Sequence, residues 1–162
     1  MAQDIEARIK ALETKVQELN DQEAIRTLRY RYHECINEGK YADIPALFTE
    51  DGQLDFGYLG HAKGQAELVP FFTQGVSRVL SFVKQFIHNH MIELQGDRGT
   101  GLSYLEAKSV SKGESYLVAA RYDDEYVKQN GQWKFKRMRL TPYFTVPLRE
   151  GWAQEDRLKM GR

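Results

Sequence analysis

The first twenty residues carry hydrophobic side chains at spacings of three and four, with charged residues between them. Ile5, Ile9, Leu12, Val16 and Leu19 form this stripe, and the spacing is typical of an amphipathic helix. It predicts a helix over residues 4–20. The stripe lasts about two heptads, fewer than the three or four that indicate a coiled coil. Two arrangements therefore stay open: a helix lying on its own domain, and a helix packed on a neighbouring subunit.

A second amphipathic segment follows Asp21, which is a candidate N-cap. Gly39 supplies its C-terminal stop. A short helix is predicted at about residues 42–48 and a longer one over residues 65–82, where Pro70 marks a start or a kink. The inner face of the second segment is formed by Ile25, Leu28, Tyr32, Cys35 and Ile36.

The rest of the chain has the alternation of β-strands. A short strand is predicted at residues 53–58, and Asn130-Gly131 is a strong hairpin signal. Helices followed by strands predict an α+β domain, in which a curved antiparallel sheet has its helices on one face. The longer strands are predicted at residues 85–94, 101–110, 115–128 and 132–145. The chain then divides into an N-terminal helix (1–20), one domain (21–150) and a polar tail (151–162) expected to be loosely held.

Charge and composition exclude several classes of partner. The 23 basic and 23 acidic side chains balance, whereas nucleic-acid binders usually show a basic excess, so no nucleic-acid or anionic-membrane partner is expected. A single cysteine, Cys35, excludes an internal disulfide. The N-terminus lacks the apolar stretch of a signal peptide, and no apolar run approaches the ~20 residues of a membrane span. A cytoplasmic location is predicted.

Three local patterns add to this order of elements. The first is residues 23–26 (Glu-Ala-Ile-Arg), followed by residues 47–52 (Leu-Phe-Thr-Glu-Asp-Gly). The second is Asn89 followed by residues 92–97 (Ile-Glu-Leu-Gln-Gly-Asp), and the third is Arg121-Tyr122-x-Asp124 followed by residues 130–135. In this order the patterns resemble the SnoaL-like (NTF2-like) superfamily, with scytalone dehydratase and bile-acid 7α-dehydratase among its members. The resemblance covers about residues 21–140.

The resemblance implies a conical cavity between the curved sheet and the helices. Members of this superfamily act on small hydrophobic molecules without a metal or an organic cofactor, so neither is expected here. Other members only bind a ligand, and fold alone does not settle function. Many are dimers or trimers, which implies a homodimer or homotrimer.

The dehydratases of this type pair a helix Asp with a strand His, and this sequence departs from that pattern. The two matching positions are Asn37 and Gln85, and neither amide is a base at neutral pH. Tyr32 is retained. An Asp–His mechanism at these positions is therefore not expected.

Four residues are the catalytic candidates, and each has a structural alternative. Tyr32 is either an acid or hydrogen-bond donor to a substrate oxygen, or a core tyrosine. Asn37 and Gln85 either hold a substrate oxygen or bond to one another. His88 faces the cavity together with Gln85 only across a β-bulge, and is otherwise a surface residue. His33 follows Tyr32 directly and is expected to point away from it.

The substrate-binding candidates are mostly aromatic, which favours a flat aromatic or polycyclic ligand. Arg139 would have to reach inward to hold a phenolate or carboxylate. The function predicted is a cofactor-independent lyase or isomerase, by a dehydratase-like or retro-aldol-type elimination. A non-catalytic domain for ligand binding or oligomerisation is the alternative. The candidates are Phe56, Tyr58, Phe72, Ala107, Ser109, Tyr122 and Arg139.

Overall fold

The chain begins with one long helix, α1 (Ala2–Asn37), in a computed structural model that describes residues 2–160, with side chains from residue 4. Met1 of the predicted N-terminal helix and Gly161 and Arg162 of the predicted tail lie outside the described residues. The helix does not restart at Asp21. Instead the Asp21 carboxylate accepts hydrogen bonds from Lys128 Nζ and Trp133 Nε1, both at 2.8 Å.

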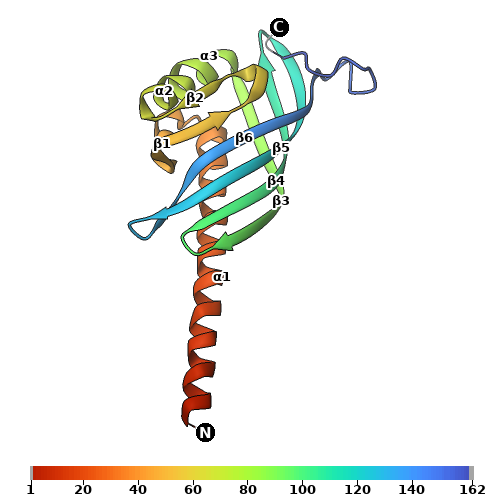
Figure 1. Cartoon of the computed structure of the whole chain (residues 1–162). Helices are drawn as coiled ribbons and strands as arrows, with labels where there is room; N and C mark the ends of the chain where they lie inside the picture. Colours follow the sequence, from red (N-terminus) through yellow and green to blue (C-terminus); the bar gives the residue numbers. More distant parts are fainter. Residues whose placement is uncertain (1, 161–162) are drawn as a thin grey trace.

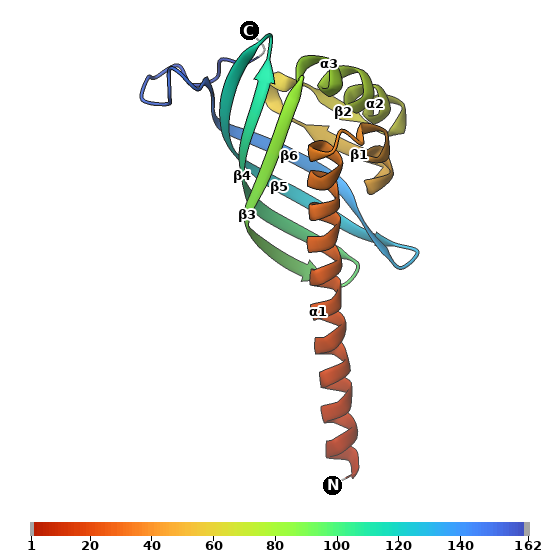
Figure 2. The ribbon, with the colours of Figure 1, turned by 180° about the vertical axis from the view of Figure 1, so that it is seen from behind.

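The first half of α1 stands clear of the rest of the molecule (Figure 1), and the view from behind shows the same (Figure 2). Leu12 is 65% exposed, whereas Ile25 and Tyr32 in the second half are fully buried. Of the two arrangements open for the N-terminal helix, packing on its own domain is therefore not found. The second half is the buried centre of the domain.

The helices after α1 are short and irregular. Two 3-10 turns, η1 (Tyr41–Asp43) and η2 (Pro45–Leu47), replace the short helix predicted near residue 45. The predicted helix at residues 65–82 is divided into α2 (Gln65–Pro70), the π-helical η4 (Phe71–Val76) and α3 (Ser77–Val79). Because proline has no N–H to donate, regular α-helical bonding is interrupted around Pro70, as the sequence predicted.

Six strands form one open, twisted sheet in the order β2-β1-β6-β5-β4-β3. The antiparallel meander of β3 to β6 agrees with the prediction. β1 runs parallel to β6, so the sheet is mixed. Its curvature wraps it around α1, with α2 and α3 at one end (Figure 1). The strands are β1 (Phe48–Asp55), β2 (His61–Lys63), β3 (Phe82–Gln95), β4 (Arg98–Ser111), β5 (Glu114–Gln129) and β6 (Gln132–Pro147), with the 3-10 turn η3 (Gly57–Leu59) between β1 and β2.

Small side chains on the inner face of β4 leave room beneath the helices. Leu105, Ala107 and Ser109 are buried there, while Glu106 and Lys108 between them are exposed and pair with each other. This is the alternation expected of a strand with one solvated face. The inner face therefore has space that larger residues would fill.

The segment after β6 returns to the domain. Leu158 forms a parallel bridge with Thr145, and Met160 is buried. The region expected to be loosely held therefore contributes a core side chain. No helix within residues 2–160 is long and apolar enough to cross a membrane.

Candidate functional site

A cavity of about 190 Å³, called here the inner cavity, lies between the end of α1, the segment α2–η4–α3 and the inner face of the sheet. Its lining is mainly aliphatic and aromatic, with a few polar groups from α1, β3, β4, β5 and β6. The polar lining residues are Tyr32, Gln85, Ser109, Tyr122 and Thr145. The position of the cavity matches the conical cavity that the resemblance implied.

The structure brings about half of the predicted site residues to this cavity. Asn37, Tyr58 and Phe72 lie close by without lining it: Phe72 is a fully buried core residue, and Tyr58 is exposed with its hydroxyl 2.6 Å from Thr145 Oγ1. His88 and Arg139 lie elsewhere. The predicted residues that line the cavity are Tyr32, Phe56, Gln85, Ala107, Ser109 and Tyr122.

Two phenols, Tyr32 of α1 and Tyr122 of β5, meet at the cavity wall. Their rings are 6.2 Å apart, edge to face. Burial raises the pKa of Tyr122 to about 12, and burial with the neighbouring Tyr122 raises the pKa of Tyr32 well above its usual value. Both hydroxyls therefore stay protonated at neutral pH and can act as hydrogen-bond donors.

Asn37 is bound to the backbone of Gln85. Its Nδ2 donates to the Gln85 carbonyl at 2.9 Å, and its Oδ1 accepts from the Gln85 N–H at 2.6 Å. Of the two alternatives for this pair, the structure thus has them bonded to one another. Asn37, the last residue of α1, joins the helix to β3.

The Gln85 side chain is held by His33, a residue that the sequence analysis placed away from the site. His33 Nδ1 lies 2.8 Å from Gln85 Oε1, and because an amide oxygen can only accept, Nδ1 carries the proton. Burial, with the nearby Arg29, lowers the pKa of His33 to about 3, so the ring is neutral. The Gln85 side chain also hydrogen-bonds Tyr122, so His33, Gln85 and Tyr122 form a connected polar chain at the cavity. His33 lies one helical turn before Asn37, so the two side chains share a face of the helix. That spacing is the sequence signal that could have placed His33 next to β3.

Some buried polar atoms at this site lack a hydrogen-bond partner among the described residues. Ser109 Oγ belongs to a cavity-lining residue, and His33 Nε2 belongs to the ring that bonds the Gln85 side chain. Buried polar atoms are nearly always satisfied by protein, water or a ligand. Such atoms in an apolar cavity are the groups with which a bound molecule carrying oxygen substituents would pair.

A buried ion pair packs against the cavity residue Tyr122. Arg29 of α1 and Asp124 of β5 are joined through Nη2 and Oδ2, and both side chains are fully buried. Tyr126 Oη also donates to Asp124 Oδ2, at 2.7 Å. The guanidinium carbon lies 4.2 Å from the centroid of the Tyr122 ring. Asp124 raises the pKa of Arg29, since loss of its proton would leave a carboxylate buried without a countercharge.

The sequence analysis required a β-bulge before His88 for that side chain to face the cavity. β3 does contain a bulge, but it lies at Asn89, one residue after His88. Asn89 has a φ of 42°, and the pairing of β3 with β4 shifts between His88 and His90. His88 stays on the outer face, 3.9 Å from Glu106 Oε2, while His90 turns inward to within 3.1 Å of Tyr126 Oη. His88 is therefore not among the groups brought together at the cavity.

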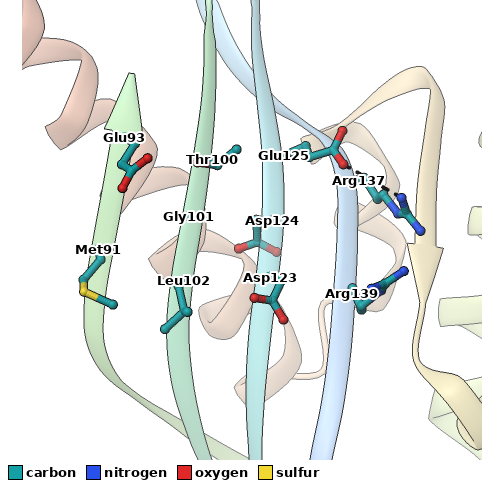
Figure 3. A pocket seen from close by; sticks show the side chains of 10 residues that line it. All are labelled: Met91, Glu93, Thr100, Gly101, Leu102, Asp123, Asp124, Glu125, Arg137 and Arg139. Atoms are coloured by element: carbon teal, nitrogen blue, oxygen red, sulfur yellow. Dashed lines mark ion pairs between the residues drawn. The ribbon is translucent and has the colours of Figure 1, made fainter. Parts of the chain in front are cut away.

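Arg139 also lies on the outer face of the sheet, 3.6 Å from Asp55 Oδ2. It borders a shallow hollow of about 440 Å³ on that face, where Arg137 pairs with Glu125 (Figure 3). The charges around this outer hollow are largely matched, and among the described residues none lines both the hollow and the inner cavity. No group of three or more His, Cys, Asp or Glu residues suited to a metal ion occurs within the described residues.

Several lining residues were missed from the sequence. They are apolar side chains of the helical segment, which look like ordinary core in the sequence, and Met160 of the tail. Met160 N lies 3.4 Å from Thr145 Oγ1, which holds the tail at the cavity. Nothing in the spacing of a polar tail indicates this return. The missed residues include Leu59, Val76, Val79, Leu80 and Met160.

Comparison with known proteins identifies the class. The sequence matches the SnoaL-like domain family over residues 17–139, and the chain therefore belongs to that family. Uncharacterised proteins of Mycobacterium tuberculosis and Mycobacterium bovis are each 26% identical over 135 residues, covering 80% of this chain and 90% of theirs.

Solved structures give the same fold. A type 2 hexachlorocyclohexane dehydrochlorinase, LinA, superposes with a TM-score of 0.80 at 18% identity, over 88% of this chain and 99% of its own. A candidate scytalone dehydratase of Novosphingobium aromaticivorans gives 0.74 at 22%, over 90% and 96%. At these identities the likeness establishes the NTF2-like fold and leaves the activity to the residues of the site.

Proposed function

We propose that the protein is a cofactor-independent lyase or isomerase acting on a small aromatic molecule with oxygen substituents in the inner cavity. The observation that carries the proposal is an apolar cavity lined by two buried phenols, Tyr32 and Tyr122, and by Ser109 Oγ, which is buried without a hydrogen-bond partner among the described residues. The structural neighbours, a dehydrochlorinase and a candidate dehydratase, support an elimination or isomerisation as the reaction class.

The volume favours one ring over fused rings. A cavity of about 150 Å³ suffices for benzene, and drug-sized ligands occupy roughly 300–1,000 Å³. The inner cavity, at about 190 Å³, lies near the lower figure. This volume supports a single substituted ring as the substrate rather than the polycyclic ligands left open by the sequence.

The polar groups are suited to stabilising negative charge on oxygen. Tyr32 and Tyr122 are protonated phenols whose pKa values are raised further by burial, and the Gln85 side chain hydrogen-bonds Tyr122. Donors fixed in an apolar site stabilise an oxyanion that develops in the transition state. None of the described residues that line the inner cavity is a carboxylate, so in this proposal the substrate supplies the electrons for the reaction.

A para-hydroxybenzylic alcohol meets this requirement. Its phenol loses the O–H proton, electrons flow through the ring, and the benzylic C–O bond breaks. The departing oxygen takes a proton, so the products are water and a quinone methide. In this reaction the site donors hold the phenolate oxygen, and Tyr32 lies among the groups able to protonate the departing oxygen.

The test compares 4-hydroxybenzyl alcohol with 4-methoxybenzyl alcohol, whose ether has no proton to lose. Trapping of the quinone methide by an added thiol, followed by chromatography, reports turnover. We expect turnover of the phenol alone, and a loss of about 100-fold in Tyr32→Phe, as for removal of an oxyanion donor. Tyr30→Phe, an exposed tyrosine on the same helix, is the matched control. Equal turnover in both variants would remove Tyr32 from the mechanism.

A non-catalytic binding domain is the second candidate. It is favoured by Asn37, whose amide groups are both bonded to the Gln85 backbone, so that the position of the family's acid has no free functional group. Thermal stabilisation by single-ring phenols without product, across dehydratable, isomerisable and retro-aldol substrates, would select this function.

A further inference from the structure

The exposed half of α1 presents a continuous apolar row that no other element within residues 2–160 covers. Its five residues are between 50% and 65% exposed. Single exposed apolar side chains are ordinary, but a contiguous row marks an interaction site. The row consists of Ile5, Ile9, Leu12, Val16 and Leu19.

This row points away from the domain that α1 enters. Leu12 is at the middle of the row, and Tyr32 is at the middle of the face buried in the domain. They are twenty positions apart in the sequence, which at ~100° per residue places them about 160° apart around the helix axis. A chain packed on the row would therefore meet the helix opposite its own domain.

We infer that the row is the seam of a parallel, in-register, two-stranded coiled coil between two copies of this chain. The spacing places Ile9 and Val16 at the a positions of a heptad, and Leu12 and Leu19 at the d positions, preceded by Ile5. β-branched residues at a combined with leucine at d favour two strands over three or four.

The charges beside the seam select the parallel direction. The g positions hold Arg8 and Lys15, and the e positions hold Glu6 and Glu13. In a parallel pair, g faces the following e of the other helix, so Arg8 meets Glu13 of the second copy. An antiparallel pair would bring g against g and e against e, which places like charges together on both sides.

The shortness of the seam is offset by its attachment to the folded domain. A free helix of this length is marginal because the first turn is costly to form. Here α1 continues without a break into residues 25–37, whose inner face is fixed in the core. The helix therefore does not have to be nucleated by association. The dimer is expected to be reversible, and to dissociate on dilution.

Light scattering and sedimentation over a range of concentrations test the dimer. We expect a mass of two chains, and an increase of at least about tenfold in the dissociation constant for Leu12→Lys, equivalent to about 1.4 kcal/mol. Thr14→Lys, on the opposite side of the same turns, is the matched control. A mass of three chains, or equal masses for the two variants, would overturn the inference.

Charge exchange tests the pairing of Arg8 with Glu13. We expect Arg8→Glu and Glu13→Arg each to weaken the dimer, and the double variant to recover the affinity of the original chain. A double variant as weak as the single ones would contradict the pairing.

An engineered cysteine tests direction. Oxidised Ile5→Cys forms a disulfide-linked dimer only if the two N-termini lie together, and Ala7→Cys, outside the seam, is the control. Cys35 is buried and does not interfere. Linkage equal to that of the control would rule out the parallel register.

Discussion

His33 of α1 donates a hydrogen bond of 2.8 Å to the side chain of Gln85 of β3, and so holds the amide of a residue that lines the inner cavity. At the two positions where the resemblance implied a helix acid and a strand histidine, the sequence has Asn37 and Gln85, and His33 lies on the helix one turn before Asn37. The helix and the strand thus remain joined by polar side chains, although the acid and the base of the family pair are both absent from their usual positions.

His33 should make stability depend on pH. Its pKa is 6.5 ordinarily and about 3 in the folded chain, because burial disfavours the charged ring. Between these values the unfolded chain binds the extra proton, so the free energy of unfolding falls as the pH falls, by up to about 1.4 kcal/mol per pH unit. Urea unfolding at pH 7 and pH 5 measures this effect. The free energy of unfolding should fall less between the two pH values in His33→Asn than in the original chain. His88→Asn, at an exposed position, controls for removal of a histidine as such.

Asp124→Asn should destabilise the fold strongly, because it leaves the Arg29 cation buried without its countercharge. Breaking a buried pair in this way costs about 3–5 kcal/mol. Its sequence neighbour offers a control, since Asp123 pairs with Arg121 at a partly exposed site and Asp123→Asn should cost less than about 1 kcal/mol. Chemical denaturation measures both. Similar losses in the two variants would contradict a special role for the buried pair.

Ser109→Ala should separate ligand binding from stability. Ser109 Oγ is buried without a partner, so removing it should change the free energy of unfolding little, or raise it. Stabilisation by a bound phenol should fall, because the ligand loses an oxygen partner. Ser103→Ala is the matched control, since Ser103 Oγ is equally buried and unpartnered but does not line the inner cavity. A ligand response that is the same in both variants would count against Ser109 as a binding group.

Much of the fold could be predicted because its periodicities are local. The four long strands and the helices appear in the sequence as spacings of two and of three or four, and Asn130-Gly131 fixes one hairpin. The continuity of α1 was missed because Asp21 looks like a cap, whereas its carboxylate is used by Lys128 and Trp133, which are distant in sequence. Such tertiary partners override local capping preference.

The site was predictable only in part, for the same reason. Tyr32 and Gln85 were found through positions shared with the family, and both line the inner cavity. Contacts between distant elements hold the other site residues: His33 of α1 bonds Gln85 of β3, and Arg29 of α1 pairs with Asp124 of β5. The spacing of residues in a single sequence does not reveal contacts of this kind. A bulge shifted by one residue was enough to exchange His88 for His90.

Met160→Ala should enlarge the inner cavity and change the size of ligand that it accepts. Met160 is buried and lines the cavity, so truncating it should cost about 2 kcal/mol or more and admit a bulkier ring substituent. Thermal shifts with phenol and with 4-propylphenol measure the change, and the preference should move toward the larger compound. Leu158→Ala alters the same segment at a residue that does not line the cavity. Unchanged preference in Met160→Ala would show that this side chain does not limit the space.

The return of the tail affects how the protein should be handled. Met160 is part of the wall of the inner cavity, so an affinity tag fused close behind this residue would lie beside the ligand site. The first turns of α1 lie at the end of the helix away from the domain (Figure 1). A cleavable tag placed there and then removed leaves the cavity undisturbed, and this is the form of the protein in which ligands should be sought.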